Sequence, residues 1–218
     1  MGVKRTIYPD REAWLSARKD GLIGASEIAS VLGIGFQSPV SLWMEKRGMR
    51  EHADLSGDER VAFGNAAEDP LRSMFRVMHP EYELTFTPYL IVRQETGDYT
   101  FLSDTPDGEL VEVETGKRGL YESKTSTCLK KADWDEWREK VPQKYYCQIC
   151  QGMYCGDYEF AVIWALLRNQ DGDGELRYYR FERADAEGDI AAICEAGKKF
   201  YDAWQSGALP PNPLPVRY

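Results

Sequence analysis

The chain has 218 residues, of which 43 % are hydrophobic and 29 % charged, and a formal net charge of −9. This length suits a single domain with a sizeable core, and the composition excludes disordered and collagen-like chains. The sequence has no run of 18 apolar residues and no apolar stretch of the signal-peptide type near its start. We therefore expect a cytoplasmic protein with no membrane partner.

The charge is unevenly distributed along the chain. Residues 1–50 hold eight basic and five acidic side chains, a net charge of +3, which leaves −12 for the remainder. Clustered Lys and Arg drive phosphate binding, so the overall acidity argues against a nucleic-acid binder. A basic N-terminal end beside a carboxylate-rich metal site would reconcile the two observations. The charge permits nucleic-acid binding without deciding it.

Cysteine and histidine content narrows the possible chemistry. The five cysteines are an odd number, which favours free thiols over a disulfide framework. Cys147, Cys150 and Cys155 have the close spacing of iron–sulfur ligands, with Cys128 or Cys194 as a possible fourth. Because Cys147 and Cys150 lie within one predicted helix, we interpret the cluster as buried thiols. Two histidines do not favour a His-based zinc site or a Ser-His-Asp site. We expect the chemistry to depend on carboxylates.

The first third of the chain is predicted to be helical. A longer helix over about 57–78 follows from the near-helical spacing of its apolar residues. Three short helices precede it, each with a capping residue or a favourable proline at its start. Their expected bounds are Asp10 to about Arg18, Ser26 to Leu32, and Ser38 to Gly48.

Extended segments begin near residue 83. LTFTPYLIV, DYTFLS, GELVEVE and GLYESKT are rich in β-branched and aromatic residues and predict a β-meander. A helix over about 142–154, strands over 157–167 and 176–183, and a helix over about 185–205 follow. The fold class is therefore α/β, a central mixed sheet flanked by helices in one domain over 1–218. Its expected parts are N-terminal helices over 10–78, a catalytic sheet with helices over 83–182, and a C-terminal helix and tail over 185–218.

Pro106-Asp107 is followed, after fourteen residues, by Glu122-Ser123-Lys124. On a strand, Glu122 and Lys124 project to one face. Two carboxylates and the main-chain carbonyl of Ser123 would suit Mg²⁺, which prefers hard oxygen ligands. A neighbouring ammonium can position or help deprotonate a water and stabilise charge on a phosphate. These are the parts of a metal-assisted phosphodiester hydrolase, although a surface salt bridge would give the same triplet.

Several sequence blocks resemble the P-D-(D/E)-x-K nuclease superfamily, and in particular its viral recombinase branch, the phage lambda exonuclease and YqaJ-like proteins. They occur in the family's order and cover about residues 14–165. The blocks are IGASEIASVLG, SPVSLWMEKRG, FGNAAEDPLRSMF, LSDTPDGEL, LYESKTS and VPQKYYCQICQGMYC.

The resemblance implies a restriction-endonuclease-like core and a Mg²⁺-dependent 5′→3′ exonuclease. Such an enzyme degrades one strand of linear double-stranded DNA from its ends and leaves a 3′ single-stranded tail for phage-type recombination. The resemblance also implies two Mg²⁺ ions with Mn²⁺ as a substitute, a homotrimeric ring, a single-strand annealing protein as partner, and a phage or prophage origin in a bacterial cell. The alternatives are an endonuclease or single-strand nuclease of the same superfamily, or a non-catalytic DNA-binding module.

The resemblance also assigns roles at the expected metal site. It implies that Glu68, Asp107 and Glu122 are metal ligands, with Asp107 able to bridge two ions. Lys124 would activate or position the water, and Gln148 would support the site. Simpler interpretations are a solvated helix residue for Glu68 and a backbone-paired side chain for Gln148.

A second implied site binds the 5′-terminal phosphate of DNA through Arg18 and Ser26. A guanidinium fork and a hydroxyl at a helix N-terminus both suit a phosphate. Lys19 and Arg11 are alternatives to Arg18, and Ser26 could be only a helix cap. At the metal site, Asp104 is the alternative to Asp107.

Trp134 and Trp137 stand apart from the other tryptophans because they lie in the polar segment KKADWDEWREK. They could pack on a neighbouring subunit, stack on DNA, or anchor a local helix. Lys130 and Lys131, just before them, are candidate phosphate contacts.

Overall fold

The computed structural model describes residues 2–19, 21–51 and 57–211. The strands, in chain order, are β1 (Val3–Ile7), β2 (Ile23–Gly24), β3 (Tyr82–Thr85), β4 (Leu90–Gln94), β5 (Leu102–Ser103), β6 (Gly108–Glu112), β7 (Arg118–Thr127), β8 (Phe160–Arg168) and β9 (Gly174–Glu182). The helices are α1 (Arg11–Lys19), the 3-10 turn η1 (Ala25–Glu27), α2 (Ile28–Val31), α3 (Pro39–Lys46), α4 (Glu59–Met78), α5 (Lys131–Asp135), α6 (Gln143–Gly156) and α7 (Arg183–Ser206). The predicted tail beyond residue 211 lies outside the described residues. None of the described helices is long and apolar enough to cross a bilayer.

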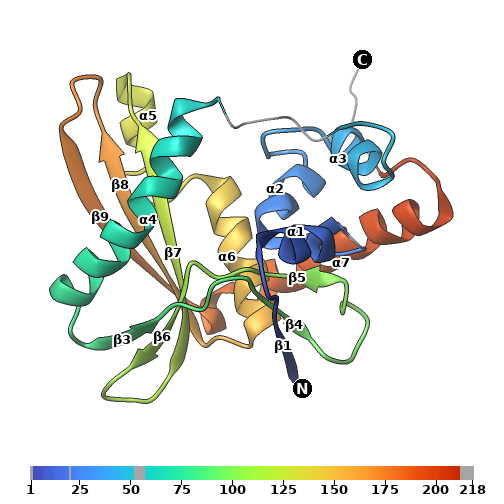
Figure 1. Cartoon of the computed structure of the whole chain (residues 1–218), viewed down its shortest axis with the longest axis horizontal. Coiled ribbons are helices and arrows are strands. Elements are labelled where there is room, and N and C mark those ends of the chain that lie inside the picture. Colours follow the sequence, from blue (N-terminus) through green and yellow to red (C-terminus); the bar gives the residue numbers. More distant parts are fainter. Residues whose placement is uncertain (1, 20, 52–56, 212–218) are drawn as a thin grey trace.

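Five strands form the central sheet in the spatial order β3-β6-β7-β8-β9. β7 and β8 run parallel, whereas the other neighbouring strands are antiparallel. Parallel neighbours need a crossover connection, which contains α6 here. Figure 1 shows α4 on one side of this sheet and α6 on the other, with α7 and the N-terminal helices beyond α6. The predicted central mixed sheet flanked by helices is confirmed.

The two faces of the sheet carry separate hydrophobic cores, and β8 contributes to both. Its even-numbered residues from Phe160 to Trp164 pack with α4, and its odd-numbered residues from Ala161 to Leu167 pack with α6 and α7. A strand buried on both faces has a nearly continuous apolar sequence, which accounts for the run AVIWALL.

The β-meander predicted from residue 83 onward is wrong, because its successive strands do not all pair. β3 pairs with β6, β4 pairs with β1, and β5 pairs in parallel with β2. The chain turns at Tyr89, whose φ of 58° lies in the left-handed region, and LTFTPYLIV is thereby divided into β3 and β4. Apolar alternation identifies strands, but the choice of partner depends on long-range contacts that the pattern does not contain.

Two of the three predicted N-terminal caps are confirmed. Asp10 Oδ1 accepts a hydrogen bond from the N–H of Ala13 at 2.9 Å, and Ser38 Oγ accepts one from the N–H of Ser41 at 3.1 Å. Each side chain satisfies an N–H group that the first helical turn leaves without a partner.

The second N-terminal helix is capped differently from the prediction. Ser26 lies inside η1, and the Glu27 carboxylate accepts the Gly24 N–H at 2.8 Å instead. The acidic side chain reaches back over the turn, as in the second half of a capping box, so the prediction that Ser26 is the cap is wrong. The Ser26 hydroxyl is left for another contact.

Trp134 and Trp137 anchor the segment around α5 to the protein. Trp137 is buried, and its carbonyl oxygen accepts a hydrogen bond from Arg177 Nη1 at 2.6 Å. Trp134 packs against the core, with the Arg177 guanidinium 5.7 Å from its ring centroid. The local-anchor interpretation is confirmed, and burial excludes Trp137 as a DNA-stacking residue.

The close packing of α6 against β7 can be tested at Gly152. A Cβ there would lie 2.5 Å from Leu120 Cδ2 and 2.9 Å from Asp104 Oδ2. We expect Gly152→Ala to lower the free energy of unfolding by about 1–2 kcal/mol, because overpacking outweighs the better helix propensity of alanine. Urea unfolding would measure this change. The matched control is Gly188→Ala on α7, where a Cβ meets nothing within 4 Å and stability should not fall. Equal losses in the two variants would contradict the packing argument.

Candidate active site

The predicted catalytic residues meet where β6 separates from β7. β6 pairs with β7 from Arg118 to Tyr121, whereas β8 follows β7 as far as Thr127. Asp107 immediately precedes β6 and lies beside the next part of β7, where its Oδ2 accepts hydrogen bonds from Ser123 N at 2.9 Å and Ser123 Oγ at 3.0 Å. The carboxylate of Asp107 thus occupies the position at which strand pairing stops.

Glu122 is buried between β7 and α6. Its Oε2 accepts hydrogen bonds from Lys124 Nζ and from Gln148 Nε2, both at 2.8 Å. The structure thus brings together three predicted residues and confirms that Glu122 and Lys124 share a face of the strand. Within the described chain, Glu122 Oε1 is buried and has no hydrogen-bond partner. A buried carboxylate oxygen without a partner is costly, and a bound cation would satisfy it.

The charges of this cluster are strongly coupled. Burial raises the pKa of Glu122, and the charges of Asp107 and Asp104 add to that effect, while the Lys124 ammonium opposes it. Burial lowers the pKa of Lys124, but the charges of Glu122 and Asp107 outweigh this effect and raise it above its ordinary value. Lys124 therefore keeps its proton at neutral pH and acts as a cation.

Glu68 approaches this site from α4. Burial and the charge of Asp107 raise the pKa of Glu68. Arg72 lies one helical turn further along, with Nη1 at 3.7 Å from Glu68 Oε2, and donates from the same nitrogen to the Asp107 carbonyl oxygen at 3.1 Å. This buried arginine fastens the chain at Asp107 to α4. Arg72 could not be predicted from the sequence, because its spacing of four from Glu68 is common on helix surfaces.

The carboxylates fit a divalent cation in their chemistry, although they do not converge on one point in this arrangement. Among the described residues, no three His, Cys, Asp or Glu side chains are placed to hold a metal ion. Asp107 is turned toward Ser123, and Glu122 toward Lys124. The unpartnered Glu122 Oε1 and the mutual repulsion of Glu68 and Asp107 are the features that Mg²⁺ would relieve.

Cys147, Cys150 and Cys155 are buried free thiols, as interpreted from the sequence. Burial raises the pKa of each. They line the inner side of α6 and belong to the hydrophobic core on that face of the sheet.

Asp104 is buried against α6, near Gly152. Burial, reinforced by the charge of Asp107, raises its pKa to about 7. Its Oδ2 has no hydrogen-bond partner within the described chain. The charges of both Lys124 and Arg18 act on it, so it lies between the two predicted sites.

Arg18 and Ser26, predicted to bind a 5′-phosphate, lie together on the N-terminal side of the protein. Arg18 Nη2 donates to Ser26 Oγ at 3.2 Å, and its guanidinium lies 4.7 Å from the centroid of the Trp14 ring. The Ser26 hydroxyl does not cap η1 and contacts Arg18 instead. Their roles in phosphate binding stay a prediction.

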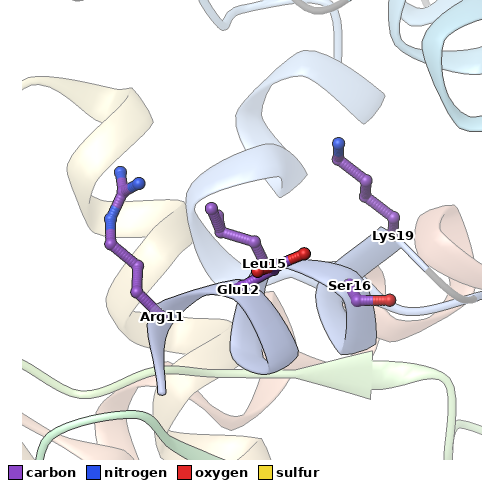
Figure 2. A pocket seen from close by; sticks show the side chains of 5 residues that line it. All are labelled: Arg11, Glu12, Leu15, Ser16 and Lys19. Atoms are coloured by element: carbon purple, nitrogen blue, oxygen red, sulfur yellow. The ribbon is translucent and has the colours of Figure 1, made fainter.

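A shallow hollow lies along α1. Figure 2 shows that Arg11 and Lys19 extend to the same side of the helix. Since they stand eight residues apart, they give one face of α1 a positive charge. The residues lining the hollow are Arg11, Glu12, Leu15, Ser16 and Lys19.

The fold is that of the alkaline exonucleases. The alkaline exonuclease of Laribacter hongkongensis superposes with a TM-score of 0.64 at 18 % identity, over 90 % of this chain and 94 % of that one. The same enzyme in complex with dAMP superposes with a TM-score of 0.65 at 18 % identity, again over 90 % of this chain and 94 % of that one. A phage-related exonuclease from Haemophilus somnus 129PT gives 0.56 at 14 % identity, over 85 % of this chain and 96 % of that one.

The sequence profile of the YqaJ-like viral recombinase domain matches residues 13–159. The chain therefore belongs to the YqaJ-like viral recombinase family. No curated protein matches it. Family and fold together support a nuclease.

The burial of Asp104 predicts a dependence of stability on pH in metal-free protein. Its folded pKa of about 7 lies above the ordinary value of 3.8, so its contribution is fully present below pH 4 and is lost as pH rises through 7. Between pH 4.5 and 6, where only the unfolded state has released this proton, the wild type should lose about 2 kcal/mol relative to Asp104→Asn, which stays neutral. Urea unfolding in EDTA at several pH values measures the difference. Parallel pH profiles would show that Asp104 does not titrate in this range.

Proposed function

We propose that this protein is a Mg²⁺-dependent 5′→3′ exonuclease. It degrades one strand of linear double-stranded DNA and leaves a 3′ single-stranded tail for phage-type recombination in the bacterial cytoplasm. The observation that carries the proposal is the buried cluster of Glu122, Lys124 and Gln148 beside Asp107. Asp107, Glu122 and Lys124 match the P-D-(D/E)-x-K pattern, and the family and fold support a nuclease.

The metal ligands in this proposal are Glu68, Asp107 and Glu122, with the main-chain carbonyl of Ser123. Two Mg²⁺ ions would share Asp107, and Mn²⁺ is expected to substitute. Bound Mg²⁺ supplies positive charge for the phosphate and lowers the pKa of a water ligand.

The protein's own side chains hold and stabilise the reacting groups. Lys124 would activate or position the attacking water, and its ammonium would stabilise negative charge that develops on the phosphate. Gln148 and Lys124 hold Glu122 through one oxygen and leave Oε1 available. Arg72 holds the backbone at Asp107 in place. These contacts preorganise the site before DNA binds.

Arg18 and Ser26 form the proposed site for the 5′-terminal phosphate, and Arg11 and Lys19 are suited to the neighbouring DNA backbone.

We further propose that the chains assemble as a homotrimeric ring around DNA and act with a single-strand annealing protein. Enclosure would keep the enzyme on DNA without a strongly basic surface, which suits a net charge of −9. Light scattering should give three times 24.9 kDa, and a stable single-chain mass would contradict the ring.

Digestion of linear duplex tests the activity. One strand carries a 5′-phosphate, and each 3′ end carries a distinct label. In Mg²⁺, but not in EDTA, the phosphorylated strand should be lost and its complement spared.

Lys124→Ala should slow cleavage by at least about 100-fold while DNA binding stays measurable, since the ammonium acts mainly in the transition state. An equal loss of binding would argue against that role.

The other outcomes of this assay correspond to the alternative functions. Internal cuts, or cleavage of covalently closed duplex, would indicate an endonuclease. Digestion of free single strands with duplex spared would indicate a single-strand nuclease. No cleavage at all would leave a DNA-binding module, which the intact catalytic cluster disfavours.

Arg18→Ala tests the phosphate site. We expect it to reduce the preference for 5′-phosphorylated over 5′-hydroxyl ends by about 10- to 100-fold, the range for hydrogen bonds to a charged group. The ratio of initial rates on the two substrates measures this preference. Arg11→Ala is the matched control on the same helix and should leave the ratio unchanged. If Arg11→Ala alters the ratio and Arg18→Ala does not, the assignment to Arg18 is wrong.

A further inference from the structure

The loop over residues 33–38, between α2 and α3, holds an aromatic side chain in solvent. Phe36 is 84 % exposed. Single exposed apolar residues are common on protein surfaces, so exposure alone carries no conclusion. Phe36 is a candidate ligand contact because its loop is held in place and lies near the catalytic cluster.

The backbone of this loop is fastened at both ends. The N–H of Gly33 donates to the Ser30 carbonyl at 3.1 Å, and that of Ile34 to the Ala29 carbonyl at 2.9 Å. The loop presses so closely on α2 that a Cβ at Gly35 would lie 2.5 Å from the Ser30 backbone nitrogen.

On the other side of Phe36, Gln37 Nε2 donates to Glu45 Oε2 at 3.0 Å, and Ser38 caps α3. The backbone on both sides of Phe36 is therefore fixed while its ring remains in solvent. A side chain held outward in this way loses little further backbone entropy when a ligand packs on it.

Phe36 lies close to the catalytic cluster. Lys144 Nζ, in the first turn of α6, is 4.1 Å from the centroid of the Phe36 ring and 5.0 Å from that of Tyr145. The Tyr145 ring centroid is in turn 5.4 Å from Lys124 Nζ. These contacts place Phe36 no more than about four nucleotide steps of 3.4 Å from the catalytic ammonium.

We propose that Phe36 stacks on a base of the strand being cut, within the first nucleotides at the DNA end, and that Lys144 pairs with the adjoining phosphate. This inference rests on the proposed nuclease function and names the base-binding part of that site. An exposed aromatic face beside a flexible cation is the combination that binds bases without sequence preference. Stacking on one aromatic ring offsets the loss of about one base-pair step, so Phe36 would help to hold a terminal base out of the duplex.

The proposal is tested by measuring how the affinity for DNA changes when the Phe36 ring, the DNA bases, or both are removed. Binding is measured in EDTA, where no cleavage occurs, with 5′-phosphorylated duplex of normal sequence and with duplex whose first four nucleotides of the phosphorylated strand are abasic. Phe36→Ala should weaken binding to normal DNA by about 5- to 100-fold and leave binding to the abasic DNA unchanged. Phe36→Trp should retain the preference for DNA with bases.

Two further variants separate stacking from other effects. Lys144→Gln should weaken binding to both DNAs alike, because the phosphates are present in both. Val77→Ala, an exposed apolar residue on α4, is the matched control and should change neither. Equal weakening of the two DNAs by Phe36→Ala would overturn the proposal, and a simultaneous loss of assembly in light scattering would assign Phe36 to a subunit contact.

The proposed function can fail separately from this inference. Wild-type protein that shows no Mg²⁺-dependent cleavage would contradict the nuclease function. The base-dependent effect of Phe36→Ala in EDTA would still be observed if Phe36 stacks on DNA.

Discussion

One buried carboxylate, that of Glu122, sets the relation between the sheet and its crossover helix. Lys124 from β7 and Gln148 from α6 both donate to the same oxygen at 2.8 Å. A buried charge is tolerated only when it is paired and hydrogen-bonded, so α6 must lie at a fixed height against β7. Gly152, one turn beyond Gln148, allows this close approach. The crossover that joins two parallel strands therefore also fixes the geometry of the site.

The site concentrates negative charge in a small volume. Burial raises the pKa of Glu68, Asp104 and Glu122, and the charge of Asp107 adds to the effect at each of them. This arrangement costs stability in metal-free protein and favours a divalent cation. It also shows how an acidic chain could act on DNA. Part of its negative charge lies in the interior, at the site where metal would bind, while α1 presents basic residues at the surface.

Two turns near the N-terminus position side chains for contacts beyond their own helices. Glu27 takes over the capping of η1, which leaves the Ser26 hydroxyl to contact Arg18. The glycine-containing loop after α2 packs so closely that Phe36 is directed into solvent beside Lys144. In both places, local hydrogen bonding and packing determine which side chain is left to contact another segment.

The sequence by itself determined most helices and strands and the carboxylate chemistry of the site. Glu122 and Lys124 are two residues apart on one strand, so strand periodicity alone placed them on one face. Asp107 is also close along the chain. Tertiary structure decided the strand partners that the predicted meander assigned wrongly, and the contact of Arg72 with the Asp107 backbone. It also decided the contact between Phe36 and Lys144. These features join segments that are distant in sequence, and local patterns of hydrophobicity and capping contain no information about which distant surface will cover them.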